Sequence, residues 1–296
     1  MDWELLKKRI VFCVLMFINI VISAMFISYI ISLFKIDVSK YEVASVKVPK
    51  AFDGFRILQL SDLHNRRFNK NNKKIVKIIE KQKPDIIVMT GDMVSSNSVG
   101  FSNFFSLVEE LDGKYPIYYI FGNHEQRLSV EKQAIIIGKL REYGVKVLNN
   151  QHEFITKDDE NIEIFGLKQE LIYYTNYLKS KKTYSYEQKD MENAIRKSDS
   201  KKFNILLAHN PLYFETYEKW GADLVFSGHV HGGIIQIPFI GGFLSPERKL
   251  FPKYSGGEYE INDSKMIVSR GLGYTKINLR FFNNPEICVV ELKSKK

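Results

Sequence analysis

The chain has 296 residues, a formal net charge of +9 at pH 7 and two cysteines, Cys13 and Cys288. Because Cys13 falls in an apolar amino-terminal stretch, an internal disulfide is excluded in the remainder, which is long enough for one large α/β domain. The basic charge favours anionic partners, but the aromatic and helix-turn-helix patterns of nucleic-acid binders are missing, so we expect no nucleic-acid partner.

The first predicted element is a membrane span over residues 10–34, which contain no charged side chain. As a helix this stretch would be roughly 37 Å long, enough to cross a hydrocarbon core of about 30 Å. A cleaved signal peptide is the alternative, although the stretch is long and no small-x-small cleavage site follows it. Basic residues favour 1–9 as a cytoplasmic tail and the later chain as extracytoplasmic. We expect 35–51 to form a linker with a first strand, and 52–296 to form the main domain.

Beyond the span, short apolar runs alternate with stretches of helical spacing. Residues 57–60 and 86–89 are β-branched and apolar throughout, as expected of strands buried on both faces of a sheet. Residues 72–81 and 104–111 have the spacing of amphipathic helices. This alternation predicts an α/β sheet.

Each of five apolar runs ends in side chains that can bind metal or move protons. In an α/β sheet such residues gather beyond the carboxyl ends of the strands, so the five runs can supply one site. Oxygen and nitrogen donors without sulfur suit divalent Mn, Fe or Zn. The residues are, in chain order, Asp62 and His64; Asp92; Asn123, His124 and Glu125; His209; and His229 and His231.

Each of these pieces also has an ordinary explanation when taken alone. An Asp-x-His triplet arises by chance, a Gly-Asp pair after a strand is usually a turn, and His209 could be a hydrogen-bonded core histidine. The occurrence of all five pieces at the ends of predicted strands is what favours a metal centre. The sixth histidine, His152, has no partner in this pattern, and we expect it in a surface loop or at a strand edge.

The series DLH, GD, GNHE, AHNP and GHVHGG resembles the calcineurin-like metallophosphoesterases over roughly residues 52–292. The segments 269–273 and 280–287 are similar to a membrane-anchored bacterial subgroup that includes proteins named UDP-diacylglucosamine hydrolases. The resemblance implies an α/β metallophosphoesterase fold, with two mixed β-sheets sandwiched between helices. It also implies hydrolysis of a phosphoester or pyrophosphate bond with two divalent metal ions.

The resemblance also implies a role for each site residue. His124 would protonate the leaving group, or alternatively support the metal ligands, and Glu125 would orient its imidazole. Arg66 and Arg280 are candidates to hold phosphate, although each could equally be a surface arginine. The family pattern gives Asp62, His64 and His231 to one metal, Asn123, His209 and His229 to the other, and Asp92 to both.

Substrate class is less sharply defined. Residues 93–97 replace the Asp-Arg-Gly sequence of protein phosphatases and exclude that activity, while Asn65 stands where many relatives have Gly. The anchor favours a substrate near the bilayer, either lipid-linked or from the envelope, such as a UDP-diacylglucosamine-like molecule. The alternatives are an inactive membrane-tethered binding protein and a broad-specificity phosphodiesterase that acts on soluble substrates.

Three further regions have two interpretations each. The tyrosine-rich residues 169–202 could cap the site, or could be a surface insertion with one helix near 186–197. Residues 236–257 are rich in Gly and Pro and predict a long loop beside His229 and His231. The lysines of 70–83 are expected on a solvated helix face, with attraction to anionic lipid as the alternative.

Overall fold

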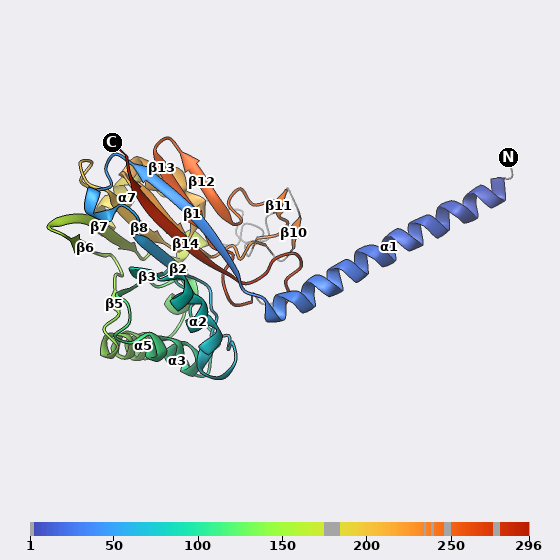
Figure 1. Cartoon of the computed structure of the whole chain (residues 1–296), viewed down its shortest axis with the longest axis horizontal. Coiled ribbons are helices and arrows are strands. Elements are labelled where there is room, and N and C mark those ends of the chain that lie inside the picture. The colour runs from blue at the N-terminus through green and yellow to red at the C-terminus, as the bar shows by residue number, and fades with distance from the viewer. Residues whose placement is uncertain are drawn as a thin grey trace.

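The computed structural model contains an extended helix and a layered α/β body (Figure 1). Helix α1 (Trp3–Phe34) projects from one end of the body. It begins seven residues before the predicted span, so the charged amino-terminal residues continue the same helix. The structure describes residues 3–174, 184–233, 235–237, 240–245, 250–274 and 279–295.

Two six-stranded sheets form the centre of the described body. The order of the first is β1-β14-β2-β3-β4-β5, and that of the second is β12-β13-β9-β8-β7-β6. The first contains β1 (Asp37–Ser45), β14 (Glu286–Ser294), β2 (Arg56–Leu60), β3 (Ile86–Met89), β4 (Ile117–Tyr119) and β5 (Lys146–Val147). The second contains β12 (Gly257–Ile261), β13 (Ser264–Val268), β9 (Leu224–Ser227), β8 (Asn204–Ala208), β7 (Glu160–Leu167) and β6 (Gln151–Lys157).

Parallel pairing connects the strands that lead to the predicted site. Strands β2, β3, β4 and β5 are parallel neighbours, as are β7, β8, β9 and β13. Strand β14 is antiparallel to β2, and the outer strands β6 and β12 are antiparallel to their partners, so both sheets are mixed. The predicted two-sheet architecture is therefore confirmed.

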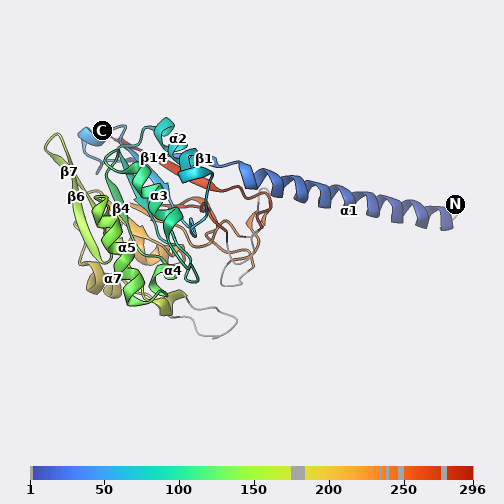
Figure 2. The same ribbon diagram turned by 90° about the horizontal axis from the view of Figure 1, so that it is seen from below.

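Helices cover the outer face of each sheet, and the described body has three apolar cores. The first sheet packs against α2 (Lys73–Gln82), α3 (Ser102–Leu111) and α5 (Val130–Glu142), which lie together in Figure 2. A second core lies between the sheets, and a third lies between the second sheet and α7 (Gln188–Ile195) and α8 (Phe214–Trp220). Because both faces of the central strands are covered, runs such as IIVM in β3 are apolar throughout.

The remaining described elements are short. They are the 3-10 helices η1 (Lys50–Phe52), η2 (Lys70–Asn72), η3 (Leu171–Tyr174) and η4 (Pro211–Tyr213), helix α4 (Asn123–Gln126), and the paired strands β10 (Gln236–Ile237) and β11 (Gly241–Gly242).

Several regional predictions can be compared with these elements. The helices expected over 72–81 and 104–111 are α2 and α3, and the one expected near 186–197 is α7. The sixth histidine, His152, lies on β6 at the edge of the second sheet, as expected. The centre of the proposed cap, residues 175–183, lies outside the described residues.

The segment between α1 and the main domain forms part of the first sheet. All nine residues of β1 pair in parallel with β14, from Asp37 opposite Glu286 to Ser45 opposite Ser294. Only Lys35 and Ile36 separate this strand from the end of α1. The apolar helix is thus joined to the sheet by a very short connection.

Candidate metal centre

The predicted site residues converge where five parallel strands end. Three of these strands belong to the first sheet and two to the second, so the site lies at the junction of the sheets. The buried Gln59 amide bridges them, donating to Thr90 Oγ1 at 2.9 Å and to the Ser227 carbonyl at 2.8 Å. Backbone bonds also connect the loops, from Asp62 N to Gly91 O at 3.0 Å and from Gly228 N to His209 O at 3.0 Å.

One group of donor atoms comes from Asp62, His64 and His231. One ligand atom from each of the three lies within 4.8 Å of the other two. His231 Nε2 is 3.2 Å from Asp62 Oδ1 and 3.0 Å from His64 Nε2. Burial lowers the pKa of His64 to about 3, and it also lowers the pKa of His231. Both imidazoles are therefore neutral at physiological pH, as metal ligation requires.

A second group comes from Asp92, His209 and His229, whose donor atoms also lie within 4.8 Å of one another. Asp92 Oδ2 is 3.1 Å from His209 Nε2 and 4.0 Å from His64 Nε2. The Asp92 carboxylate thus stands between the two groups. All three side chains are buried, with His209 at 1% and His229 at 4% exposed.

Asn123 offers a further donor atom for a metal ion. Its side chain is 3% exposed, and its Oδ1 atom has no hydrogen-bond partner among the described residues. A buried carbonyl oxygen without a partner is costly, and a cation would satisfy it. Together with the neutral imidazoles and two carboxylates, this oxygen fits a pair of divalent cations.

His209 is oriented by the backbone of the neighbouring strand end. Its Nδ1 donates to the Thr90 carbonyl at 2.6 Å, so that Nε2 points at the Asp92 carboxylate. Burial lowers the pKa of His209, but the charge and hydrogen bond of Asp92 and the charge of Asp62 outweigh it and raise the value to about 10. A proton and a metal ion would compete for the same Nε2 lone pair.

The loops that carry these side chains have unusual backbone conformations. Five of the seven predicted ligands have positive φ, a region that few residues other than glycine occupy, and such strain gathers at functional sites. The values are 50° at Asp62, 49° at His64, 51° at Asp92, 70° at His229 and 55° at His231. Asn65, which replaces a Gly of many relatives, has φ of 56°, a conformation that Asn tolerates better than most side chains.

His124 lies beside the two groups, with its ring edge toward His64 at a centroid distance of 4.7 Å. Its backbone N–H donates to Asp92 Oδ1 at 2.7 Å, and its Nδ1 accepts from the Ser96 N–H at 3.0 Å. A neutral His124 with this bond carries its proton on Nε2. Burial lowers the pKa of His124.

Glu125 has a different partner from the one predicted. Its carboxylate accepts three backbone N–H groups, from Asp92 at 2.9 Å, Gly122 at 3.0 Å and Val94 at 3.2 Å. Ser96 rather than Glu125 therefore orients the His124 ring, and Glu125 holds the loop that carries Asp92. The prediction was wrong on this point because adjacency in sequence does not fix where two successive side chains point on a helical turn.

The two candidate phosphate-binding arginines bond to backbone carbonyls. The Arg66 guanidinium donates to Leu272 O at 3.0 Å and Leu33 O at 3.3 Å, and stacks between the rings of Phe68 and Tyr274. Arg280 is 2% exposed and donates to Arg270 O, Gly271 O and Gly273 O. These bonds give both arginines a structural role. Burial, together with the charges of Arg66 and Arg270, lowers the pKa of Arg280 to about 9.

Tyr174 lies at the site, although the sequence predicted no specific role for it. Its ring packs edge-on against His229 at 5.1 Å and lies 6.0 Å from His209. The side chain is 7% exposed, and its hydroxyl has no hydrogen-bond partner among the described residues. Burial raises the pKa of Tyr174 well above its usual value, so the hydroxyl remains a donor. The tyrosine-rich composition of 169–202 was the only signal for it.

Asn283 is a second such residue. Its amide donates to the carbonyls of His231 at 2.7 Å and Gly233 at 2.5 Å, and so holds the His231 loop in place. It belongs to the RFFNNP segment, which resembles the membrane-anchored bacterial subgroup, and the bonds to the His231 loop give this resemblance a structural reason.

This geometry defines the class of protein. Two mixed sheets meet at the ends of their parallel strands, and histidine and aspartate side chains that can bind metal gather there. This arrangement is typical of metal-dependent phosphoester hydrolases. The sequence model of the calcineurin-like phosphoesterases matches residues 55–233. The chain belongs to this family and is a metallophosphoesterase that hydrolyses phosphoester bonds.

Two sequence relatives, YkuE and YaeI, agree with this assignment. The chain is 30% identical to the uncharacterized metallophosphoesterase YkuE of Bacillus subtilis over 267 residues, covering 88% of this chain and 86% of the relative. It is 29% identical to the phosphodiesterase YaeI of Escherichia coli over 242 residues, covering 80% of this chain and 82% of the relative. The phosphopantetheinyl hydrolase of Mycobacterium tuberculosis is similar with a TM-score of 0.45 and 12% identity, over 73% of this chain and 89% of that structure.

Proposed function

We propose that this protein is a membrane-anchored, dinuclear metallophosphoesterase acting on a lipid-linked or envelope substrate that contains a phosphodiester or pyrophosphate bond. The proposal of two metal ions rests on the position of Asp92, which lies between two clusters of metal-binding side chains. The Asn123 oxygen, which has no hydrogen-bond partner among the described residues, adds a further donor. The proposed division assigns Asp62, His64 and His231 to one ion, Asn123, His209 and His229 to the other, and Asp92 to both. Mn, Fe and Zn all suit this donor set.

The chain supplies specific groups around these ions. When bound, two divalent cations polarise a phosphoryl oxygen and lower the pKa of a bound water. His124 holds a proton on Nε2, the nitrogen not engaged by Ser96, and delivers it to the leaving oxygen. The buried hydroxyl of Tyr174 donates to a non-bridging oxygen of the substrate. The Glu125 carboxylate keeps the Asp92 loop in position through its three N–H bonds.

The anchor assignment is supported by α1. An 18-residue window of this helix has a mean hydropathy of 2.8 and no residue buried within the protein. Its last turns pack on the body, where the Ser28 hydroxyl accepts the Phe282 N–H at 2.5 Å and Ser32 is fully buried. A signal peptide that is cleaved would lose these contacts, so a retained anchor is favoured. The charge asymmetry around the helix favours residues 1–9 in the cytoplasm and the domain from 52 onward outside.

The substrate class follows from the anchor and the relatives. The name of YaeI makes a diester the first choice for the bond that is cleaved. A helix that ends two residues before the first strand keeps the metal centre close to the bilayer, which favours substrates presented by lipid, such as a UDP-diacylglucosamine-like molecule.

The experiment is a metal-dependence assay on the full chain in detergent micelles. The protein is stripped with chelator and supplied with Mn, Fe or Zn, and turnover of bis(p-nitrophenyl) phosphate is compared with that of p-nitrophenyl phosphate. We expect activity only with metal, two ions per chain, and preference for the diester. A folded protein that binds two ions and cleaves neither compound would instead be a tethered binding protein. In a second assay the full chain in vesicles is given a diester embedded in the bilayer, and turnover equal to that of the soluble diester would favour broad specificity.

A further inference from the structure

Exposed apolar side chains lie on two segments, one of which contacts the end of α1 that meets the body. They come from two segments that are far apart in sequence from α1. Large exposed apolar side chains that gather on one face mark an interaction surface. We name these residues the apolar collar: Ile240 at 66% exposed, Leu250 at 61%, Phe251 at 54%, Leu279 at 36% and Phe282 at 44%.

The collar is built into the fold. The Phe251 N–H donates to Phe243 O at 3.0 Å, and the two rings lie 5.3 Å apart. The Gln236 N–H donates to Phe281 O at 3.0 Å, which joins the two collar segments. Phe281 and the backbone N–H of Phe282 contact Tyr29 and Ser28 of α1. The second collar segment is therefore held against the helix at Phe281 and Phe282, and β10 and β11 lie on the same side of the body as α1 in Figure 1.

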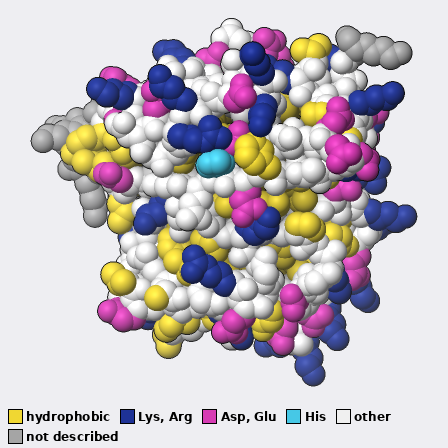
Figure 3. All heavy atoms as spheres, turned by 90° about the vertical axis from the view of Figure 1, so that its left-hand side faces the viewer, with side chains coloured by type: hydrophobic (Ala, Val, Ile, Leu, Met, Phe, Trp, Pro, Cys, Tyr) yellow, Lys and Arg dark blue, Asp and Glu magenta, His cyan; other side chains and the backbone are white. Residues whose placement is uncertain are grey.

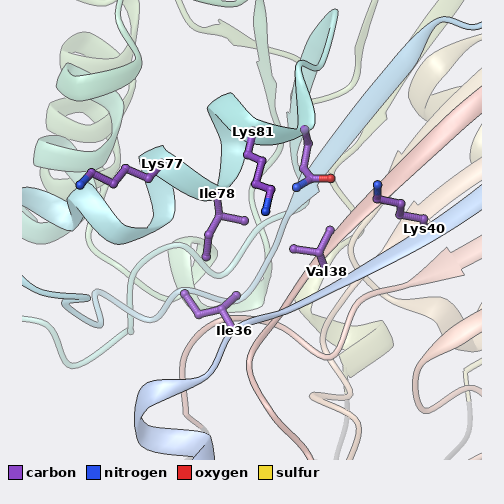
Figure 4. A pocket seen from close by; sticks show the side chains of 7 residues that line it. Ile36, Val38, Lys40, Lys77, Ile78 and Lys81 are labelled. Carbon is purple, nitrogen blue, oxygen red and sulfur yellow. The ribbon is translucent and has the colours of Figure 1, made fainter.

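A basic hollow lies on another side of the same helix end, between β1 and α2 (Figure 4). Its volume is about 490 Å³. Three apolar side chains (Ile36, Val38 and Ile78) and three lysines (Lys40, Lys77 and Lys81) line it, along with Gln82 and no acidic residue. No described residue forms an ion pair with these lysines. Apolar side chains bordered by unpaired lysines complement an anionic lipid surface.

The opposite face of the body is different. Figure 3 shows that face, where Lys and Arg side chains lie among Asp and Glu, with hydrophobic side chains between them. Exposed apolar residues elsewhere on the sheets are mostly single, such as Phe154 on β6 and Val46 after β1. The apolar collar thus occurs at the end of the body where α1 would enter a bilayer.

We propose that the face around the end of α1 is a second membrane contact, in which the collar enters an anionic bilayer and the three lysines meet its headgroups. This proposal rests on the proposed anchoring of α1. Phe282 is followed by Asn283, which holds the His231 loop, so the proposed contact would involve a segment that adjoins the metal centre.

The test uses tryptophan as a depth probe in the full chain. Phe251→Trp and Phe282→Trp are made in a Trp3→Phe background, in which the buried Trp220 remains as a constant signal. Each variant is reconstituted into vesicles of phosphatidylcholine and phosphatidylglycerol brominated near the headgroup end of the chains. Phe154→Trp is the matched control, since Phe154 is 47% exposed on the distant strand β6.

We expect bromination to remove at least about half of the added emission at both collar positions, as for side chains buried about 5–10 Å into the interface, and to leave the control unchanged. Quenching that is equal at 251, 282 and 154, or absent at all three, would overturn the collar contact. Turnover of bis(p-nitrophenyl) phosphate in micelles is measured on the same samples. If the wild type with metal does not hydrolyse this compound, the proposed function is refuted, but the quenching result still tests the membrane contact.

A separate experiment tests whether the lysines of the hollow contact anionic lipid headgroups. Lys77→Gln combined with Lys81→Gln is compared with Lys219→Gln, an exposed lysine on α8. Phosphatidylglycerol retained from mixed nanodiscs is counted by native mass spectrometry. We expect the double variant to retain less phosphatidylglycerol than the wild type and the control to match the wild type. An unchanged count in the double variant would overturn the role of the lysines.

Discussion

Glu125 supports the metal site through three backbone bonds, and its removal should show how strongly the site depends on them. The Glu125→Ala variant leaves the N–H groups of Asp92, Val94 and Gly122 buried without their acceptor. Each unsatisfied buried donor costs about 1–3 kcal/mol, so we expect a loss of at least roughly 3 kcal/mol in the free energy of unfolding. For a domain of this size, that loss lowers the melting temperature by roughly 6 °C or more.

The measurement is thermal and urea unfolding of the metal-free full chain in micelles, because bound metal would add its own stabilisation. Glu125→Gln keeps one acceptor oxygen and should fall between wild type and Ala. Glu109→Ala, at an exposed site on α3, is the control and should stay within about 0.5 kcal/mol of wild type. A loss below about 1 kcal/mol for Glu125→Ala would refute the reasoning, since even one orphaned donor costs that much.

Three further predictions concern the reaction and its surroundings. His124→Ala should keep both metals and lose most turnover, and a fall in metal content measured by mass spectrometry would make His124 a ligand instead. Tyr174→Phe keeps the ring against His229 but removes the hydroxyl, so kcat/KM should fall by roughly 10- to 100-fold with metal content unchanged, and full activity would limit Tyr174 to packing. Glu286 is the pH-dependent case: burial raises its pKa, but the charge and bonds of Arg270 outweigh burial and hold it below the usual 4.5. The stabilising contribution of the ionised Glu286 is then present above about pH 4.5 and is lost as the pH falls through the lowered pKa. The difference in free energy of unfolding between wild type and Glu286→Gln should therefore shrink from pH 6 to pH 3. A difference that stays constant would contradict this.

The sequence alone predicted the α/β architecture and the set of candidate metal ligands. Residues 57–60 and 86–89 are apolar on both faces because the sheets are covered on both sides, so their strands could be predicted from composition. The donors follow strand ends because loops beyond parallel strands are where backbone and side chains are free to face a ligand. The apolar amino-terminal helix was also evident, since 25 uncharged residues need no tertiary partner to be recognised as a potential span.

Tertiary structure decided how those residues are oriented and which partners they have. Glu125 bonds to the Asp92 loop while Ser96 orients His124, because side-chain direction depends on backbone angles that neighbouring residues in the sequence do not share. Arg66 joins the metal loop to the end of α1, a contact between segments that are adjacent only after folding. The apolar collar likewise exists only once the segment of β10 and β11 bonds to Phe281 and the neighbouring Phe282 bonds to the end of α1. Sequence therefore determined which chemical groups are present. Long-range packing determined the hydrogen-bond partners of these groups and the position of the exposed apolar side chains.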